Sequence, residues 1–226
     1  MVAMRQWPVL LGATLMLALA PAAGFGQGTA AKLSPAQAAL FASDHLHAIT
    51  KPAVLHYAFR HDGGAAARYS DTISLEIKAV HADGKKDVAV AFLSGPRHLP
   101  FAPVTDFNGN PLLMYFLQYD VMSMQRATGG DPSFFRNRIR DAFLDGAEMH
   151  PVTLTLDGKQ AAGTEIVIHP YAKLVVPALA RYTGKSYSFV LSAAVPGMLY
   201  SIASLLPESG KEPAVTESAT FVSEGP

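Results

Sequence analysis

The chain has 226 residues, with 18 basic and 18 acidic side chains, no cysteine, and 50% hydrophobic residues. This neutral balance argues against a nucleic-acid binder, since such proteins usually carry a clear excess of basic residues. The absence of cysteine excludes disulfides, thiolate metal sites and cysteine nucleophiles. With 16% charged residues, the chain is apolar enough to form a folded domain rather than to stay disordered throughout.

Residues 1–23 have the pattern of a secretory signal peptide. Arg5 precedes an apolar run from Val9 to Ala20, and Ala20-Pro21-Ala22 fits the small-x-small cleavage pattern. The run is shorter than the ~20 residues that a spanning helix needs, although an uncleaved membrane anchor is the alternative interpretation. We therefore expect a periplasmic or secreted protein, a linker over 24–33, and no transmembrane segment after cleavage.

A first helix is expected over residues 34–48. Ser34, Pro35 and Gln37 stand in the order of a capping box with proline at the first helical position. Strands follow. Apolar and polar residues alternate cleanly from Tyr69 to Ala79, and Asp83-Gly84 is a hairpin turn signal. Residues 53–94 therefore predict a three-stranded antiparallel meander.

The middle of the chain changes to a helical pattern. Asn110-Pro111 and Asp131-Pro132 are two helix starts of the same kind, and Thr128-Gly129-Gly130 separates them. This punctuation predicts a helical hairpin made of helices 111–126 and 132–145.

Strand patterns then return. The expected strands cover 152–156, 164–169, 187–191 and 198–202. Residues 207–226 hold four glutamates against one lysine among many Ser, Thr and Pro, which predicts a disordered acidic tail. The expected fold is a single α+β domain over 34–206, with a curved antiparallel sheet of about seven strands and the helical hairpin inserted.

Helix 111–126 is apolar on two sides, which is typical of a helix that is buried or that meets an apolar partner. One interpretation is a plain core helix between the sheet and the second helix. The other is a helix that lines an apolar pocket, with Tyr115, Tyr119 and Met124 as adaptable ligand contacts.

Asp120 interrupts the apolar stripe of this helix, and a buried carboxylate needs a partner. The second helix offers Arg136, Arg138 and Arg140. A bidentate bridge from one of these arginines to Asp120 would set the register of the hairpin. The alternative is that Asp120 and the arginines form an anion site for a ligand carboxylate or phosphate.

No motif selects an enzyme, a metal or a cofactor. The sequence contains no G-x-S-x-G, no P-loop and no dinucleotide-binding fingerprint, and Gly24-Phe25-Gly26 lies at the export junction. His45 and His47 are two residues apart on the expected helix and so face away from each other. We expect no metal, no cofactor and no catalytic residue, and a hydrolase of unrecognised type is kept only as an alternative.

The element order over residues 53–205 is similar to that of lipoprotein-carrier half-barrels, in which helices cross the concave side of the sheet. This resemblance concerns topology and rests on no motif. It implies a non-enzymatic binder or carrier of an apolar or lipid-like small ligand, while an anionic ligand is expected only from the alternative interpretation of Asp120 and the arginines. The alternative function is an envelope interaction or assembly protein that has a protein partner and no small-molecule ligand.

Overall fold

The structure is a computed structural model that describes residues 33–64 and 66–225. The expected signal peptide and nearly all of the expected linker lie outside the described residues, so both stay predictions. Within the described ranges, no helix combines the length and the apolar character needed to cross a membrane.

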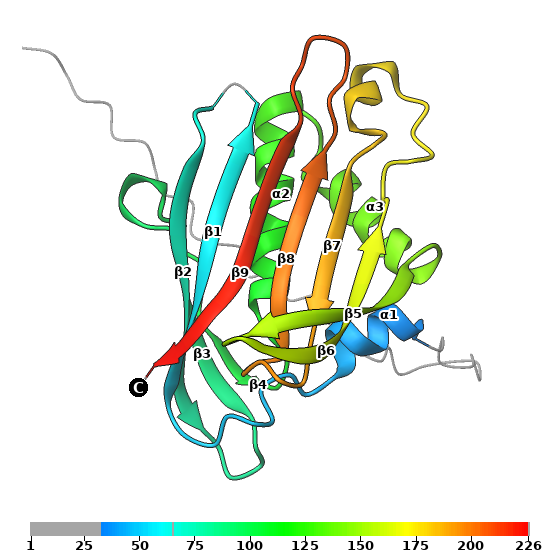
Figure 1. Ribbon diagram of the computed structural model, residues 1–226. Helices are drawn as coiled ribbons and strands as arrows, with labels where there is room; N and C mark the ends of the chain where they lie inside the picture. Colours follow the sequence, from blue (N-terminus) through cyan, green and yellow to red (C-terminus); the bar gives the residue numbers. More distant parts are fainter. Residues whose placement is uncertain (1–32, 65, 226) are drawn as a thin grey trace, which may run out of the picture. The chain divides into compact units, whose positions relative to one another are not determined.

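The described chain is an α+β fold built on one antiparallel sheet that is not closed (Figure 1). It has nine strands, in the order β4-β3-β2-β1-β9-β8-β7-β6-β5. The strands are β1 Ala53–Gly63, β2 Tyr69–Val80, β3 Lys86–Phe92, β4 Val104–Phe107, β5 Glu148–Leu156, β6 Lys159–Ile168, β7 Ser186–Leu191, β8 Leu199–Leu206 and β9 Val215–Gly225. The expected class and the meander of β1, β2 and β3 are confirmed, whereas β4 and β9 exceed the expected seven strands.

The expectation of a disordered tail over 207–226 was wrong. Strand β9 lies in the centre of the sheet, where it pairs with β1 on one side and with β8 on the other. The amino-acid composition of this segment predicted disorder because composition does not register the alternation of buried and exposed residues along a strand. In β9, Glu217 and Ala219 are buried, while Thr216 is exposed. The folded domain therefore extends to Gly225.

The first helix is shorter than the expected 34–48. The capping box of Ser34 and Gln37 forms around α1 Pro35–Gln37, and a π-helical turn, η1 Ala38–Ala42, completes the helix. The helix ends because Ser43 is extended and its hydroxyl donates to the Ala38 carbonyl. Beyond it, the N–H of Leu46 donates to the Asn108 carbonyl, a tertiary contact that overrides the continued helical pattern.

The helical hairpin is confirmed to within two residues at each end. Helix α2 covers Leu112–Thr128 and helix α3 covers Pro132–Leu144. Asp131 caps α3 by accepting from the Ser133 N–H, and Gly129 ends α2 in the left-handed conformation that glycine tolerates. Two short 3₁₀ helices, η2 Gly95–Arg97 and η3 Pro177–Tyr182, lie in connections.

Helix α2 lies behind the middle strands of the sheet, with α3 beside it (Figure 1). The inner strand residues and the inner side of α2 are buried together in one apolar core. Helix α2 contributes Leu112, Leu113, Phe116, Tyr119, Asp120, Val121 and Met124. The interpretation of α2 as a core helix is therefore the one that this packing supports, since these side chains fill the interior.

A buried polar network fixes the start of α2 on the sheet. Asn110 donates from its side chain to the Tyr57 hydroxyl and the Gly197 carbonyl, and its backbone N–H donates to His45 Nδ1 at 3.2 Å. His45 Nε2 is 2.8 Å from the Ala39 carbonyl. Because Nδ1 accepts and Nε2 donates, His45 is neutral, and burial lowers its pKa below the usual value.

Protonation of His45 should destabilise the protein. Its folded-state pKa is lowered, so the unfolded chain binds this proton more readily, and stability present above about pH 6.5 is lost as the pH falls below it. In urea titrations at pH 7.5 and 5.5, His45→Gln should lose less stability on acidification than the wild type. The exposed His169→Gln should keep the wild-type pH dependence; equal behaviour of the two variants would contradict the assignment.

Deletion of residues 215–226 should abolish cooperative folding, because β9 carries hydrogen bonds to strands on both of its sides. Near-ultraviolet circular dichroism during heating measures this. Replacement of Lys211 by Ala, in the loop before β9, serves as the control and should leave the transition in place. A truncated chain that still melts cooperatively would show that β9 is dispensable.

Candidate functional site

A row of polar residues crosses the inner face of the sheet beneath α2. The strand register places Tyr69 of β2 opposite His61 of β1, His61 opposite Glu217 of β9, Glu217 opposite Ser204 of β8, and Ser204 opposite Tyr187 of β7. Residues opposite each other on neighbouring strands share a face of the sheet. We call these five side chains the inner polar row.

Helix α2 reaches one half of the inner polar row through Tyr119. The Tyr119 hydroxyl donates to Glu217 Oε1 at 2.6 Å, and His61 Nδ1 lies 2.9 Å from the same oxygen. The His61 ring stacks on Tyr69 with centroids 4.9 Å apart. Burial, followed by the Glu217 charge, raises the pKa of Tyr119 above its usual range, so this hydroxyl stays protonated and donates.

Helix α2 reaches the other half through Asp120, which is 1% exposed. Lys185 Nζ lies 2.7 Å from Asp120 Oδ1, and the Tyr187 hydroxyl donates to Oδ2 at 2.5 Å. Lys185 is itself 5% exposed, so this ion pair is buried. Burial, followed by the Asp120 charge, raises the pKa of Tyr187, so its hydroxyl stays protonated and donates to Asp120.

Tyr171 lies next to the same cluster, beside Tyr187. It is fully buried, and within the described ranges its hydroxyl has no hydrogen-bond partner. Its pKa is raised by burial and then by the Asp120 charge, and it is lowered by the hydroxyl of the neighbouring Tyr187. The Tyr187 oxygen keeps free lone pairs after donating to Asp120, so it is the group to which Tyr171 can donate after a small adjustment.

A hollow of about 420 Å³ lies beside this cluster. It is lined by Gly64, Arg181, Tyr182, Leu206, Lys211, Glu212, Pro213 and Val215. Tyr182 connects the two, because it lines the hollow and its carbonyl accepts a hydrogen bond from the backbone N–H of Lys185 at 2.9 Å.

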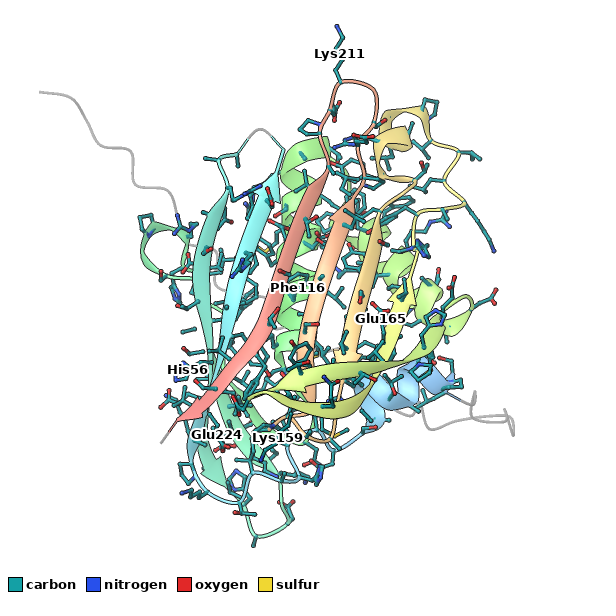
Figure 2. All side chains as sticks on the ribbon, in the orientation of Figure 1. His56, Phe116, Lys159, Glu165, Lys211 and Glu224 are labelled. Carbon is teal, nitrogen blue, oxygen red and sulfur yellow. The ribbon has the colours of Figure 1, made fainter. Side chains whose placement is uncertain are left out.

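The loop between β8 and β9 forms one wall of the hollow and is held by Arg181. The guanidinium donates to the carbonyls of Pro207 at 2.5 Å and Pro213 at 2.7 Å, and pairs with Glu212 at 2.6 Å. Gly184 allows the close approach, since a Cβ there would lie 2.6 Å from the Pro207 ring. Lys211 stands at the tip of the loop and points away from the domain (Figure 2).

The expected bridge between Asp120 and an arginine of α3 was wrong. Arg136 donates to Ser133, Arg138 lies over the Phe134 ring, and Arg140 contacts Asp141. Helix α3 buries its apolar stripe instead, and Asp120 faces the sheet, where Lys185 and Tyr187 meet it. The three arginines are therefore not gathered around Asp120.

The other ligand-contact candidates from the sequence lie in different parts of the structure. Tyr119 and Asp120 join the inner polar row, and Met124 is buried in the core. The Tyr115 ring stacks on Phe101, and its hydroxyl donates to the Ala102 carbonyl at 2.6 Å, away from the row. A ligand role for any of them stays a prediction.

Several members of the site were not among the residues that the sequence singled out. Tyr187 begins the expected strand 187–191 and Lys185 lies two residues before it, but no pattern paired either of them with Asp120. His61 lies at the end of β1, and no sequence pattern marked it as a site residue. Glu217 lay in the segment expected to be disordered, which hid its alternation with Ala219.

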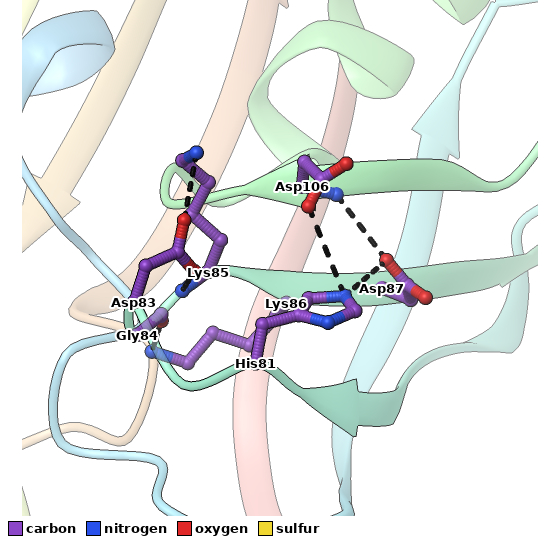
Figure 3. Close-up of polar contacts among 7 residues, drawn as sticks. All are labelled: His81, Asp83, Gly84, Lys85, Lys86, Asp87 and Asp106. Atoms are coloured by element: carbon purple, nitrogen blue, oxygen red, sulfur yellow. Dashed lines mark hydrogen bonds and ion pairs between the residues drawn. The ribbon is translucent and has the colours of Figure 1, made fainter.

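A second group of charged residues surrounds the turn between β2 and β3 (Figure 3). His81 lies 2.9 Å from Asp87, a hydrogen bond that raises the pKa of this histidine. Asp83 pairs with the neighbouring Lys85, while the buried Lys86 donates to the Gly84 carbonyl. Across the described residues, no three His, Cys, Asp or Glu side chains are placed to hold a metal.

Both carboxylates of the site are engaged by donors, and a metal-ligand set is not among the described side chains. The chemistry that this arrangement supports is hydrogen bonding and charge pairing inside an apolar interior. Such a network can fix α2 on the sheet, and the same groups could also recognise a polar group on an apolar molecule.

No protein-family model matches the sequence, and no curated protein matches it. Among solved structures, the lipoprotein LppX of Mycobacterium tuberculosis aligns at 11% identity and a TM-score of 0.32, over 76% of this chain and 86% of that one. MucB in complex with MucA(peri) aligns at 12% identity and a TM-score of 0.33, over 76% of this chain and 50% of that one. A LolA superfamily protein of Nitrosomonas europaea aligns at 9% identity and a TM-score of 0.22, over 84% of this chain and 92% of that one. These weak likenesses define no family for the chain.

Replacement of Asp120 by Asn should leave the Lys185 charge buried and unpaired, at a cost of about 3–5 kcal/mol in the free energy of unfolding. Urea unfolding followed by circular dichroism measures the change. The matched control is Asp141→Asn, which removes the exposed contact with Arg140 and should cost no more than about 1 kcal/mol. Similar losses in both variants would mean that the buried pair has no special weight.

Proposed function

We propose that the chain is an exported, non-enzymatic binder or carrier of an apolar ligand, which it holds between the inner face of the sheet and α2. The observation that carries the proposal is the inner polar row, together with Tyr119 and Asp120, set inside an interior that is mainly apolar.

The energetic argument concerns the buried ion pair of Asp120 and Lys185. Taking two charges out of water costs several kcal/mol each, and well-packed apolar residues often stabilise a fold as well or better. The pair is thus not needed for stability alone. Burial raises the pKa values of Tyr119, Tyr182 and Tyr187 around this pair, and perturbed titratable groups clustered beside a hollow are a recurrent sign of a binding site.

Ligand entry requires α2 and α3 to move away from the sheet, since side chains fill the space between them. Met124 and Tyr119 suit such a movement because methionine is flexible and tyrosine combines an apolar body with a polar tip. The pattern of residues 1–23 supports export, and with it a periplasmic or extracellular location for the binder.

The test uses the environment-sensitive apolar dye N-phenyl-1-naphthylamine on residues 24–226. We expect saturable fluorescence enhancement, and an apolar compound recovered by organic extraction and mass spectrometry. Val121→Phe adds bulk on the buried side of α2 and should weaken dye binding, whereas Met122→Phe, one residue along on a partly exposed side, should not. Circular dichroism confirms that both variants are folded.

A partner protein of the envelope is the second candidate. Phe41 and Leu144 are exposed apolar residues beside Phe143, whose ring contacts that of Phe41. Absence of dye binding and of extractable ligand, combined with a stoichiometric envelope protein that co-purifies, would favour this function over the first.

A further inference from the structure

The connection between β6 and β7 carries an exposed apolar tip. Val175 is 92% exposed, the highest value for a large apolar side chain among the described residues, and Val176 beside it is 42% exposed. Pro177 and Ala178 follow, and both are exposed. We call residues 175–178 the apolar tip. Single exposed apolar side chains are common on protein surfaces, but an unbroken run of them usually has a function.

The apolar tip is held in place on both sides. Before it, Leu174 is 9% exposed, and its backbone N–H donates to the Tyr171 carbonyl at 2.9 Å. After it, the Leu179 N–H donates to the Val176 carbonyl at 2.9 Å, in the first turn of η3. Arg181, near the end of η3, bonds to the loop between β8 and β9. These anchors fix the tip in its outward position.

The apolar tip lies at the same end of the sheet as the loop between β8 and β9 (Figure 1). Both connections border the hollow, because Arg181 and Tyr182 of η3 line it together with Lys211 and Pro213 of the loop. The side chain of Lys211 points away from the domain at this end (Figure 2). The tip and Lys211 are therefore presented together, beside the hollow.

The charges around the apolar tip are positive on balance. Lys173, two residues before the tip, and Lys211 are both exposed, and within the described ranges neither forms an ion pair with a carboxylate. Arg181 and Glu212 neutralise each other at 2.6 Å. Glu208 is the one acid of these two connections that has no such partner among the described residues. Two lysines against one glutamate attract an anionic surface rather than repel it.

A lipid surface fits the apolar tip better than a folded protein does. A stable protein interface takes about 800 Å² and roughly 20–30 residues from each partner, whereas the tip is a single short turn. Pro177 has no N–H, and the 3₁₀ geometry of η3 cannot add a strand to a sheet. Binding at a membrane interface needs only apolar side chains that enter it by about 5–10 Å, with basic residues beside them.

We propose that the apolar tip docks the domain on the surface of an anionic phospholipid bilayer. Val175 and Val176 enter between the headgroups, and Lys173 and Lys211 face the lipid phosphates. Docking in this way brings the hollow next to the membrane. The inference is independent of the proposed function, because the tip and its lysines are exposed whether or not the interior binds a ligand.

The first test places a fluorescent reporter at the tip. Residues 24–226 contain every described strand and helix and the whole buried core, and they exclude Trp7, the only tryptophan of the chain. Val175→Trp in this segment therefore gives a protein with a single tryptophan. Its emission should shift to shorter wavelength when vesicles of about three parts phosphatidylcholine to one part phosphatidylglycerol are added, because the indole leaves water. Val222→Trp is the matched control, since Val222 is 60% exposed on β9 and outside the tip, and its emission should stay unchanged.

The second test measures affinity by sedimentation with the same vesicles. Val175→Ser should weaken binding about tenfold, because burial of one valine side chain accounts for about that factor, while Val222→Ser should bind as the wild type does. Lys211→Ala should weaken binding about fivefold, and it should have no effect on vesicles of phosphatidylcholine alone. Lys159→Ala, at the opposite end of the sheet (Figure 2), is its control. Circular dichroism confirms that the variants are folded.

The outcomes that overturn the inference are specific. An unchanged emission of Val175→Trp, or equal binding of Val175→Ser and Val222→Ser, would show that the tip does not enter the bilayer. Loss of binding in Phe41→Ser instead would place the membrane contact at the other exposed apolar residues. A chain that ignores vesicles but crosslinks through position 175 to one envelope protein would dock a protein and not a lipid surface. Dye binding in the interior is measured separately, so each proposal can fail alone.

Discussion

The pairing of β9 with both β1 and β8 is the interaction on which the rest of the structure depends. In the sheet order of the described chain, the strands before the helical hairpin and those after it meet only through β9. Without this strand, each half would end in an unpaired edge, and unpaired edges are costly and prone to aggregate. The last segment of the chain thus converts two meanders into one continuous sheet.

The same strand makes the site possible. Glu217 comes from β9 and lies opposite His61 on one side and Ser204 on the other. The inner polar row is consequently continuous from β2 to β7 only because β9 lies between them. Folding of the sheet and assembly of the site are one event, since a chain that misplaces β9 loses both.

Helix α2 combines two functions that usually exclude each other. Its buried side chains fill the core, yet Tyr119 and Asp120 place a hydroxyl and a carboxylate in that core. Each finds a partner on the sheet, Glu217 for the first and the pair of Lys185 and Tyr187 for the second. The bonds also fix which side of the helix faces the strands, because an unpaired buried carboxylate would be expensive.

Local chemistry in the sequence determined much of the fold. The proline and cap residues at Asn110-Pro111 and Asp131-Pro132 locate α2 and α3, because they act within one helical turn, and the alternation of Tyr69 to Ala79 locates β2. The tertiary structure alone decided the role of β9, whose mean composition hides its alternation, and the end of the first helix at Ala42, where Leu46 bonds to Asn108 instead. It alone also paired Asp120 with Lys185 rather than with an arginine of α3. That choice depends on which strand faces α2, and strand order is set by contacts between residues far apart in the chain, which periodicity does not encode.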